Sequence, residues 1–110
     1  MSVFRARLKK WSMVFLPVES RFSLIYKKQY WGDGQSESAS GQGSSLAATE
    51  NIRKELPRIL KELNCRKIMD LGCGDFNWMR TVQLEVDYLG VDVVEQVIKE
   101  NTNQKRRNSL

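Results

Sequence analysis

The sequence lacks histidine altogether and has only two cysteines, Cys65 and Cys73, among its 110 residues. The absence of histidine excludes zinc sites made of cysteine and histidine, histidine general bases and serine-histidine triads, and we expect no metal centre. Two isolated cysteines are too few for a disulfide framework. They fit a reducing compartment, so we expect a cytoplasmic protein.

Long apolar runs are also absent. No stretch approaches the roughly 18 residues typical of a membrane-spanning helix, so we expect no transmembrane segment. The basic start resembles a charged leader, but the apolar stretch over residues 11–18 is short and contains Ser12 and Pro17. No small-residue cleavage site follows it, and we expect no cleaved signal peptide. The composition, 41% hydrophobic and 28% charged, is typical of a small globular domain.

The net charge of +5 is distributed unevenly. Residues 1–30 carry seven bases and one acid, residues 31–94 seven bases and ten acids, and residues 95–110 four bases and two acids. A basic arm can contact the phosphates of a nucleic acid or an anionic membrane surface. The simpler interpretation of the same charges is a solvated helix face.

The first 45 residues divide into a basic helical arm, residues 1–31, and a Gly/Ser-rich loop, residues 32–45. Within the arm, an apolar stripe at steps of four, three and four predicts a helix that Pro17 ends; the stripe consists of Phe4, Leu8, Trp11 and Phe15. A second short helix is expected over residues 20–31. We expect the loop to be mobile, either as a flexible linker or as a lid over a ligand.

The rest of the chain alternates helix and strand signals over residues 46–104, followed by a basic tail, residues 105–110. An apolar stripe predicts a helix over 46–63, with a kink or break where Pro57 follows Leu56. The later elements are expected as a buried strand 66–71, a glycine turn, a short helix 77–83, a strand 88–92 and a helix 93–104. This order predicts an α/β fold with parallel strands, because the 16 residues between the strands leave room for a crossover helix.

The glycine turn, Asp70-Leu71-Gly72-Cys73-Gly74, follows the first strand, and open α/β sheets bind ligands at that edge. Gly72 permits a tight turn, and Gly74 lets the backbone approach a ligand without a Cβ in the way. Asp70 is an acceptor that can orient the turn or bind a cationic amine. Asp92 ends the second strand, where a carboxylate can accept hydrogen bonds from both hydroxyls of a ribose.

The neighbouring residues narrow the choice of ligand. A dinucleotide fingerprint requires a third glycine where Asn77 stands, and no Gly-Lys-Ser/Thr of a triphosphate loop follows. Asp75 and Phe76 place negative charge and bulk where a pyrophosphate would lie. A ligand with an adenosine and an amino-acid cation fits this acidic turn better. Trp11, Trp31 and Trp78 could stack on bases, but we interpret them as core or lid packing residues.

These motifs, Asp70-Leu71-Gly72-Cys73-Gly74-Asp75-Phe76 and Tyr88-Leu89-Gly90-Val91-Asp92, resemble the first two motifs of class I S-adenosylmethionine-dependent methyltransferases. The resemblance covers residues 46–104, and residues 30–79 are similar to small bacterial methyltransferase-domain proteins of undefined substrate. It implies S-adenosyl-L-methionine as cofactor, held by Asp70, Gly72 and Gly74, with Asp92 on the ribose. Cys73 and Asp75 would contribute backbone groups, and Phe76 replaces the third glycine of the usual motif.

The same resemblance implies a Rossmann-like sheet of seven strands, of which this sequence reaches the second. We therefore expect a truncated chain, a missing C-terminal half or an oligomer, with Ile68, Leu71, Leu89 and Val91 lacking covering partners. Neither a catalytic base nor the methyl acceptor is assigned. Two alternatives stay open: a non-enzymatic interaction or nucleic-acid-binding remnant with basic arms, and a different nucleotide-binding α/β domain.

Overall fold

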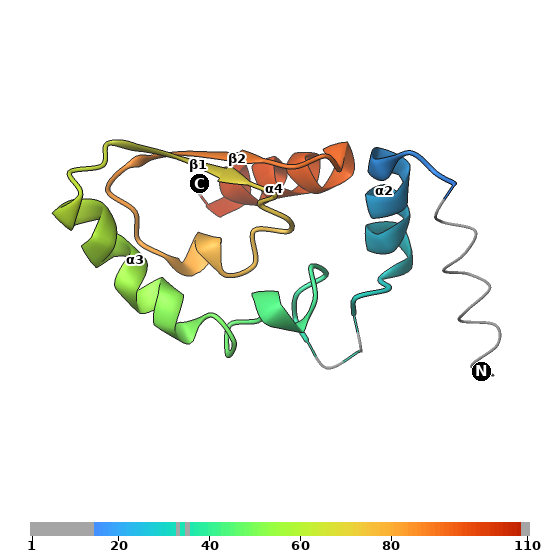
Figure 1. The fold of residues 1–110 in the computed structure, drawn as a ribbon, viewed down its shortest axis with the longest axis horizontal. Helices are drawn as coiled ribbons and strands as arrows, with labels where there is room; N and C mark the ends of the chain where they lie inside the picture. Colours follow the sequence, from blue (N-terminus) through green and yellow to red (C-terminus); the bar gives the residue numbers. More distant parts are fainter. Residues whose placement is uncertain (1–14, 33, 35, 109–110) are drawn as a thin grey trace.

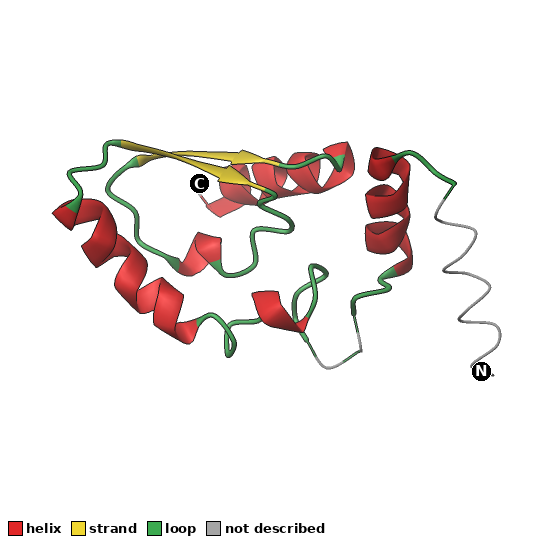
Figure 2. Cartoon of the chain, in the orientation of Figure 1, coloured by secondary structure: helices red, strands yellow, loops and turns green. Residues whose placement is uncertain are grey.

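The computed structural model describes residues 15–32, 34 and 36–108 of the chain. The helix expected from Phe4 to Phe15 lies outside these residues apart from its last position. Figures 1 and 2 show the remaining elements, namely α2 (Val18–Lys28), a 3-10 helix (Gln42–Ser44), α3 (Glu50–Glu62), β1 (Lys67–Leu71), a 3-10 helix (Met79–Thr81), β2 (Asp87–Val91) and α4 (Glu95–Asn108). The described chain is therefore of the mixed α/β class.

The two strands form a parallel sheet, as the sequence predicts. Their register runs from Lys67 beside Asp87 to Leu71 beside Val91. The crossover between them differs from the prediction, because residues 77–83 form only the single 3-10 turn Met79–Thr81. Phe76 has a left-handed backbone with φ of 59°, and Val82 is extended, so a longer helix is prevented at both ends.

Helix α3 is shorter at its start than predicted and continuous through Pro57. The amide and the hydroxyl of Thr49 both donate to the carbonyl of Ser45, at 3.1 and 2.7 Å, so the chain before Glu50 forms turns. The expected break at Leu56 is wrong. One proline removes a single intrahelical hydrogen bond, and ion pairs from Arg58 to residues on either side of Pro57 support this stretch.

Among the residues that the structure describes, the buried apolar side chains are Leu60, Met79, Val94 and Val97. One face of the sheet is open to solvent, so the prediction of a buried first strand is wrong. On that face Leu71, Leu89 and Val91 are 73%, 54% and 39% exposed, which confirms that they lack covering partners. Ile68 differs from the expectation, since it is half-buried on the opposite face.

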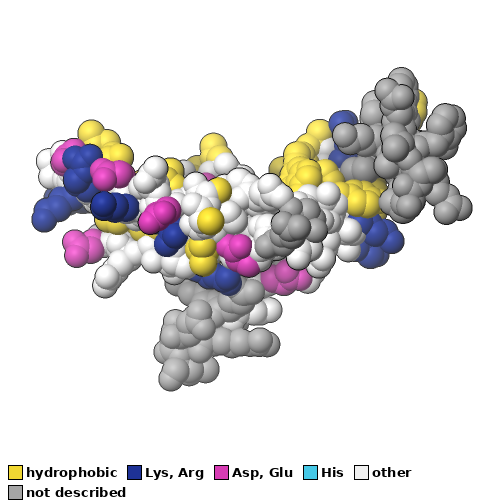
Figure 3. Space-filling view, turned by 90° about the horizontal axis from the view of Figure 1, so that it is seen from below, with side chains coloured by type: hydrophobic (Ala, Val, Ile, Leu, Met, Phe, Trp, Pro, Cys, Tyr) yellow, Lys and Arg dark blue, Asp and Glu magenta, His cyan; other side chains and the backbone are white. Residues whose placement is uncertain are grey.

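Helix α2 begins directly after Pro17, two residues earlier than predicted, and its Tyr26 hydroxyl lies 2.7 Å from Ser40 Oγ. Figure 3 shows hydrophobic side chains gathered at the α2 end of the molecule, whereas charges of both signs mix at the α3 end. Helix α4 continues to Asn108, so most of the expected basic tail is helical. Among the described residues, no helix combines the length and apolar character needed to cross a membrane.

Candidate functional site

A cavity of 550 Å³ lies at the carboxyl ends of β1 and β2. In Figure 2 both strand arrows point toward the side on which α2 lies. The cavity is lined by the two strand ends, the glycine turn, α2, serines of the Gly/Ser-rich loop, and the rings of Trp31 and Trp78. Its predicted members are Asp70, Gly72, Cys73, Gly74 and Asp92. The structure thus brings five of the six predicted site residues together, and Asp75 lies outside the lining.

The carboxylate of Asp92 joins the glycine turn to the start of α4. Its Oδ2 accepts the backbone N–H of Gly74 at 2.9 Å, and its Oδ1 accepts that of Val94 at 3.0 Å. A carboxylate oxygen has two lone pairs, so each oxygen keeps one for a further donor. Asp92 is therefore fixed in place and still able to accept hydrogen bonds from a ligand in the cavity.

Asp70 faces the cavity from the end of β1 and accepts a hydrogen bond from the Tyr88 hydroxyl at 2.7 Å. Burial, together with this bond, raises the pKa of Tyr88 above its ordinary value. Tyr88 therefore stays protonated and keeps donating to Asp70. The second carboxylate of the site is thus oriented by a neighbour on the adjacent strand.

Cys73 lies in the glycine turn and lines the cavity together with both carboxylates. Burial, followed by the negative charges of Asp92 and Asp70, raises the pKa of its thiol to about 11. The thiol is neutral at physiological pH and is not an activated nucleophile. We therefore interpret Cys73 as a small packing residue rather than a catalytic thiol.

All four backbone amides of the turn, residues 72–75, donate within the protein. Those of Gly72 and Cys73 bond to the carbonyl of Val91, at 2.7 and 3.0 Å. That of Gly74 bonds to Asp92, and that of Asp75 bonds to Ser40 Oγ at 3.1 Å. The helix N-terminus expected here is replaced by a short 3-10 turn. The turn therefore offers no free amide to a phosphate.

The two glycines of the turn face different surroundings. Both have positive φ, 82° for Gly72 and 56° for Gly74. A Cβ on Gly72 would meet no atom within 4 Å, whereas one on Gly74 would lie 2.4 Å from Ser40 Oγ. The space kept free at Gly74 is thus filled by the protein itself, and the room for a ligand lies over Gly72.

Asp75 holds residues 36–45 of the Gly/Ser-rich loop, named the serine loop below, against the turn. Its carboxylate accepts the amide of Ala39 at 2.8 Å and the hydroxyls of Ser38 and Ser40 at 3.0 and 3.2 Å. Ser38 is only 1% exposed. The loop is therefore anchored by hydrogen bonds in the absence of a ligand, which argues against the mobility expected from its composition.

One wall of the cavity is aromatic and was not predicted from the sequence; it is formed by Phe22, Tyr26 and Trp31. The ring of Trp31 contacts those of Phe22 and Tyr26 edge-to-face, with centroids 5.8 and 5.9 Å apart. The spacing of four between Phe22 and Tyr26 was the available signal, because it places both on one helix face. What joins this face to the glycine turn is tertiary packing.

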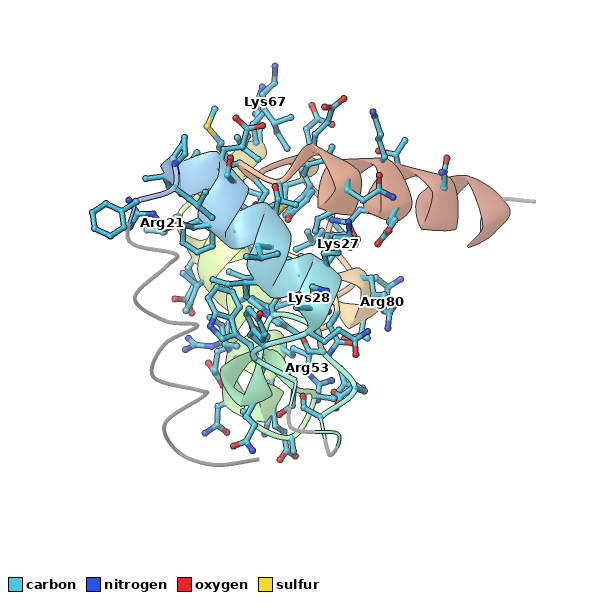
Figure 4. All side chains as sticks on the ribbon, turned by 90° about the vertical axis from the view of Figure 1, so that its right-hand side faces the viewer. Arg21, Lys27, Lys28, Arg53, Lys67 and Arg80 are labelled. Carbon is cyan, nitrogen blue, oxygen red and sulfur yellow. The ribbon has the colours of Figure 1, made fainter. Side chains whose placement is uncertain are left out.

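In the part of the chain that the structure describes, no lysine or arginine lines the cavity. Figure 4 labels six basic side chains and shows Arg21 and Lys27 on different sides of α2. A spacing of six residues places two side chains about 120° apart around a helix. Among the described residues, no group of three or more cysteine, aspartate or glutamate side chains could hold a metal ion. The site is therefore one of carboxylate acceptors and aromatic rings.

No family model, curated protein or solved structure matches this chain in comparisons with known proteins.

Proposed function

We propose that this chain binds S-adenosyl-L-methionine and belongs to a class I methyltransferase. The donor site would be the 550 Å³ cavity at the sheet edge. The proposal combines the resemblance of the two strand-end motifs with the chemistry of that cavity. Pockets of about 300–1,000 Å³ are typical of cofactor-sized ligands.

The observation that carries the proposal is that the site offers two carboxylates and no free main-chain amide from the glycine turn. Every amide of the turn is already bonded within the protein, and the described residues that line the cavity include carboxylates but no lysine or arginine. A ligand held there should contribute its own donors and positive charge. Besides one carboxylate, S-adenosylmethionine has an ammonium group, a sulfonium and a ribose diol, whereas a dinucleotide would bring the two charges of a pyrophosphate to this acidic site.

The residues have separate roles in this proposal. Asp92 would accept the ribose hydroxyls, and Asp70 would face the cationic amino-acid end. Gly72 and Cys73 would form the floor, with the aromatic residues of α2 opposite. The cofactor itself would supply an electrophilic methyl group, so the protein's contribution is positioning of donor and acceptor. No described residue is assigned as a catalytic base.

The proposal includes the Rossmann-like arrangement, of which β1, the glycine turn and β2 would be the first unit. The uncovered face and edges of the sheet are what an incomplete sheet would leave exposed, as in a chain missing its remaining strands. Both cysteines are free, which is compatible with a cytoplasmic location. The nucleic-acid alternative depends mainly on the basic residues of the first 14 positions, which lie outside the described part.

Isothermal titration of the full chain with three ligands tests the proposal. We expect saturable binding of S-adenosylmethionine and of its demethylated product, and no binding of NAD. All three ligands contain an adenosine. The comparison therefore shows whether the site prefers the amino-acid end of the S-adenosyl compounds or the pyrophosphate of NAD. Binding of NAD alone, or of none of the three, would overturn the proposal.

A further inference from the structure

The attachment of the serine loop to the glycine turn centres on one carboxylate, that of Asp75. Its Oδ2 accepts the main-chain amide of Ala39 at 2.8 Å, and its Oδ1 accepts that of Asn77 at 3.2 Å. The hydroxyls of Ser38 and Ser40 bond to the same group. Asn77 is 2% exposed and adds a second link, since its side-chain amide donates to the Ser44 carbonyl at 3.0 Å.

This attachment extends to the aromatic wall through a chain of hydroxyls. The Ser40 hydroxyl has one proton, which it donates to Asp75, and its oxygen lies 2.7 Å from the Tyr26 hydroxyl. Tyr26 must therefore be the donor in that pair. Because the Tyr26 ring contacts Trp31, the order Asp75, Ser40, Tyr26, Trp31 connects the turn to the far wall of the cavity.

We propose that Asp75 is a positioning residue for the cofactor site. It does not line the cavity, but it holds the serine loop and, through Ser40, the aromatic wall of α2 in the place that closes the cavity. This inference rests on the proposed function, and it changes the role of Asp75 from a backbone contact with the cofactor to a side-chain anchor for one wall of the site.

Coupling between the anchor and the ligand follows from linkage. If the closed loop forms the wall that contacts the ligand, closure raises ligand affinity, and the ligand stabilises closure by the same factor. A bound ligand should then slow hydrogen exchange at the Ala39 amide. A residue that merely supports the fold would not produce this ligand-dependent protection.

The variant Asp75→Asn tests the anchor because asparagine cannot replace the carboxylate in either orientation. The amides of Ala39 and Asn77 donate to different oxygens and cannot reverse. One of them must therefore face the Asn NH₂ group, whichever way the side chain is turned. The matched control is Asp87→Asn, an exposed carboxylate at the start of β2 that makes the same change of charge.

Hydrogen exchange and isothermal titration are measured on the full chain, with and without S-adenosylmethionine. We expect Asp75→Asn to lose protection at Ala39 and to bind at least 10-fold more weakly, and Asp87→Asn to resemble the wild type. If Asp75→Asn does not fold, Tyr26→Phe takes its place as the test variant. It removes only the hydroxyl and should also weaken binding. It keeps the ring that contacts Trp31.

The outcomes separate this inference from the proposed function. If the wild type binds and both Asp75→Asn and Tyr26→Phe bind equally well, Asp75 does not position the site and the inference is overturned. If the wild type binds no ligand, the proposed function fails and the inference that rests on it fails too. Unchanged protection of Ala39 in a folded Asp75→Asn protein would also overturn the inference, independently of any ligand.

Discussion

The backbone N–H of Gly74 donates to Oδ2 of Asp92 over 2.9 Å, although 18 residues separate them in the chain. This bond joins the turn after β1 to the residue after β2. It fixes the ribose-binding candidate relative to the turn, and it uses the amide that would otherwise be available to an anion. One contact thus both organises the site and disfavours phosphate ligands.

Replacing Asp92 should affect stability and binding together. Asp92→Ala leaves two amides without acceptors, at an expected cost of about 1–3 kcal/mol in the free energy of unfolding. Affinity for S-adenosylmethionine should fall by roughly 10- to 150-fold, because hydrogen bonds to a charged group are worth about 1.5–3 kcal/mol. Asp92→Asn should cost less, since its amide keeps one acceptor oxygen. Urea unfolding and isothermal titration measure the two effects.

The control for Asp92 is Glu95→Gln on the first turn of α4. The Glu95 side chain is 75% exposed and pairs with Lys99, and surface pairs of this kind contribute little. We expect near wild-type stability and binding. Equal affinity in the wild type and Asp92→Ala would remove Asp92 from the site.

The two glycines of the turn should respond differently to alanine. Gly72→Ala should cost about 1–2 kcal/mol, because alanine is strained at positive φ but meets open space. Gly74→Ala has the same strain and also brings a Cβ to 2.4 Å from Ser40 Oγ, so it should displace the serine loop. Thermal unfolding should therefore show a larger loss for Gly74→Ala. Identical losses, with Ala39 equally protected in both variants, would contradict the tight approach of Ser40.

The sequence predicts the parts of this fold that depend on local patterns. Helix α2 and both strands lie within one or two residues of their predicted bounds, except that α2 ends at Lys28, because apolar periodicity and Pro17 act over a few residues. The glycine turn with Asp70 and Asp92 was located by the same means. Most of the predicted site was thus available before any tertiary contact was known.

The errors arise where distant residues decide the structure. Ser38 and Ser40 bond to Asp75 across 37 and 35 residues, so composition alone marked their loop as mobile. The predicted crossover helix does not form, because Phe76 adopts a left-handed backbone conformation that is more typical of glycine. The exposure of β1 was not predicted either, because the sequence of an apolar strand does not show whether distant residues cover both of its faces.

Alkylation of Cys73 should be slow in the folded protein. Its pKa rises from 9.0 to about 11, so at pH 8 the thiolate fraction should be about 100-fold smaller than in the urea-unfolded chain. Since the folded pKa is the higher one, the group's stabilising contribution is complete below pH 9 and is lost as pH rises through 11. Iodoacetamide labelling followed by peptide mass spectrometry measures the rates. Equal rates at pH 8 in both states would show that the thiol is not buried beside the carboxylates.

The open face of the sheet should make the chain self-associate. Met69 and Leu89 are register partners on that face, 62% and 54% exposed, and unpaired strand edges flank them. The pair Met69→Lys with Leu89→Glu removes the apolar surface without changing net charge, so it should lower the association seen by sedimentation velocity over a concentration series. The matched control, Ile59→Lys with Leu63→Glu, alters two exposed apolar residues, one on α3 and one directly after it, and should leave association unchanged. A wild type that stays monomeric at every concentration, or a control as effective as the sheet pair, would show that this face does not drive association.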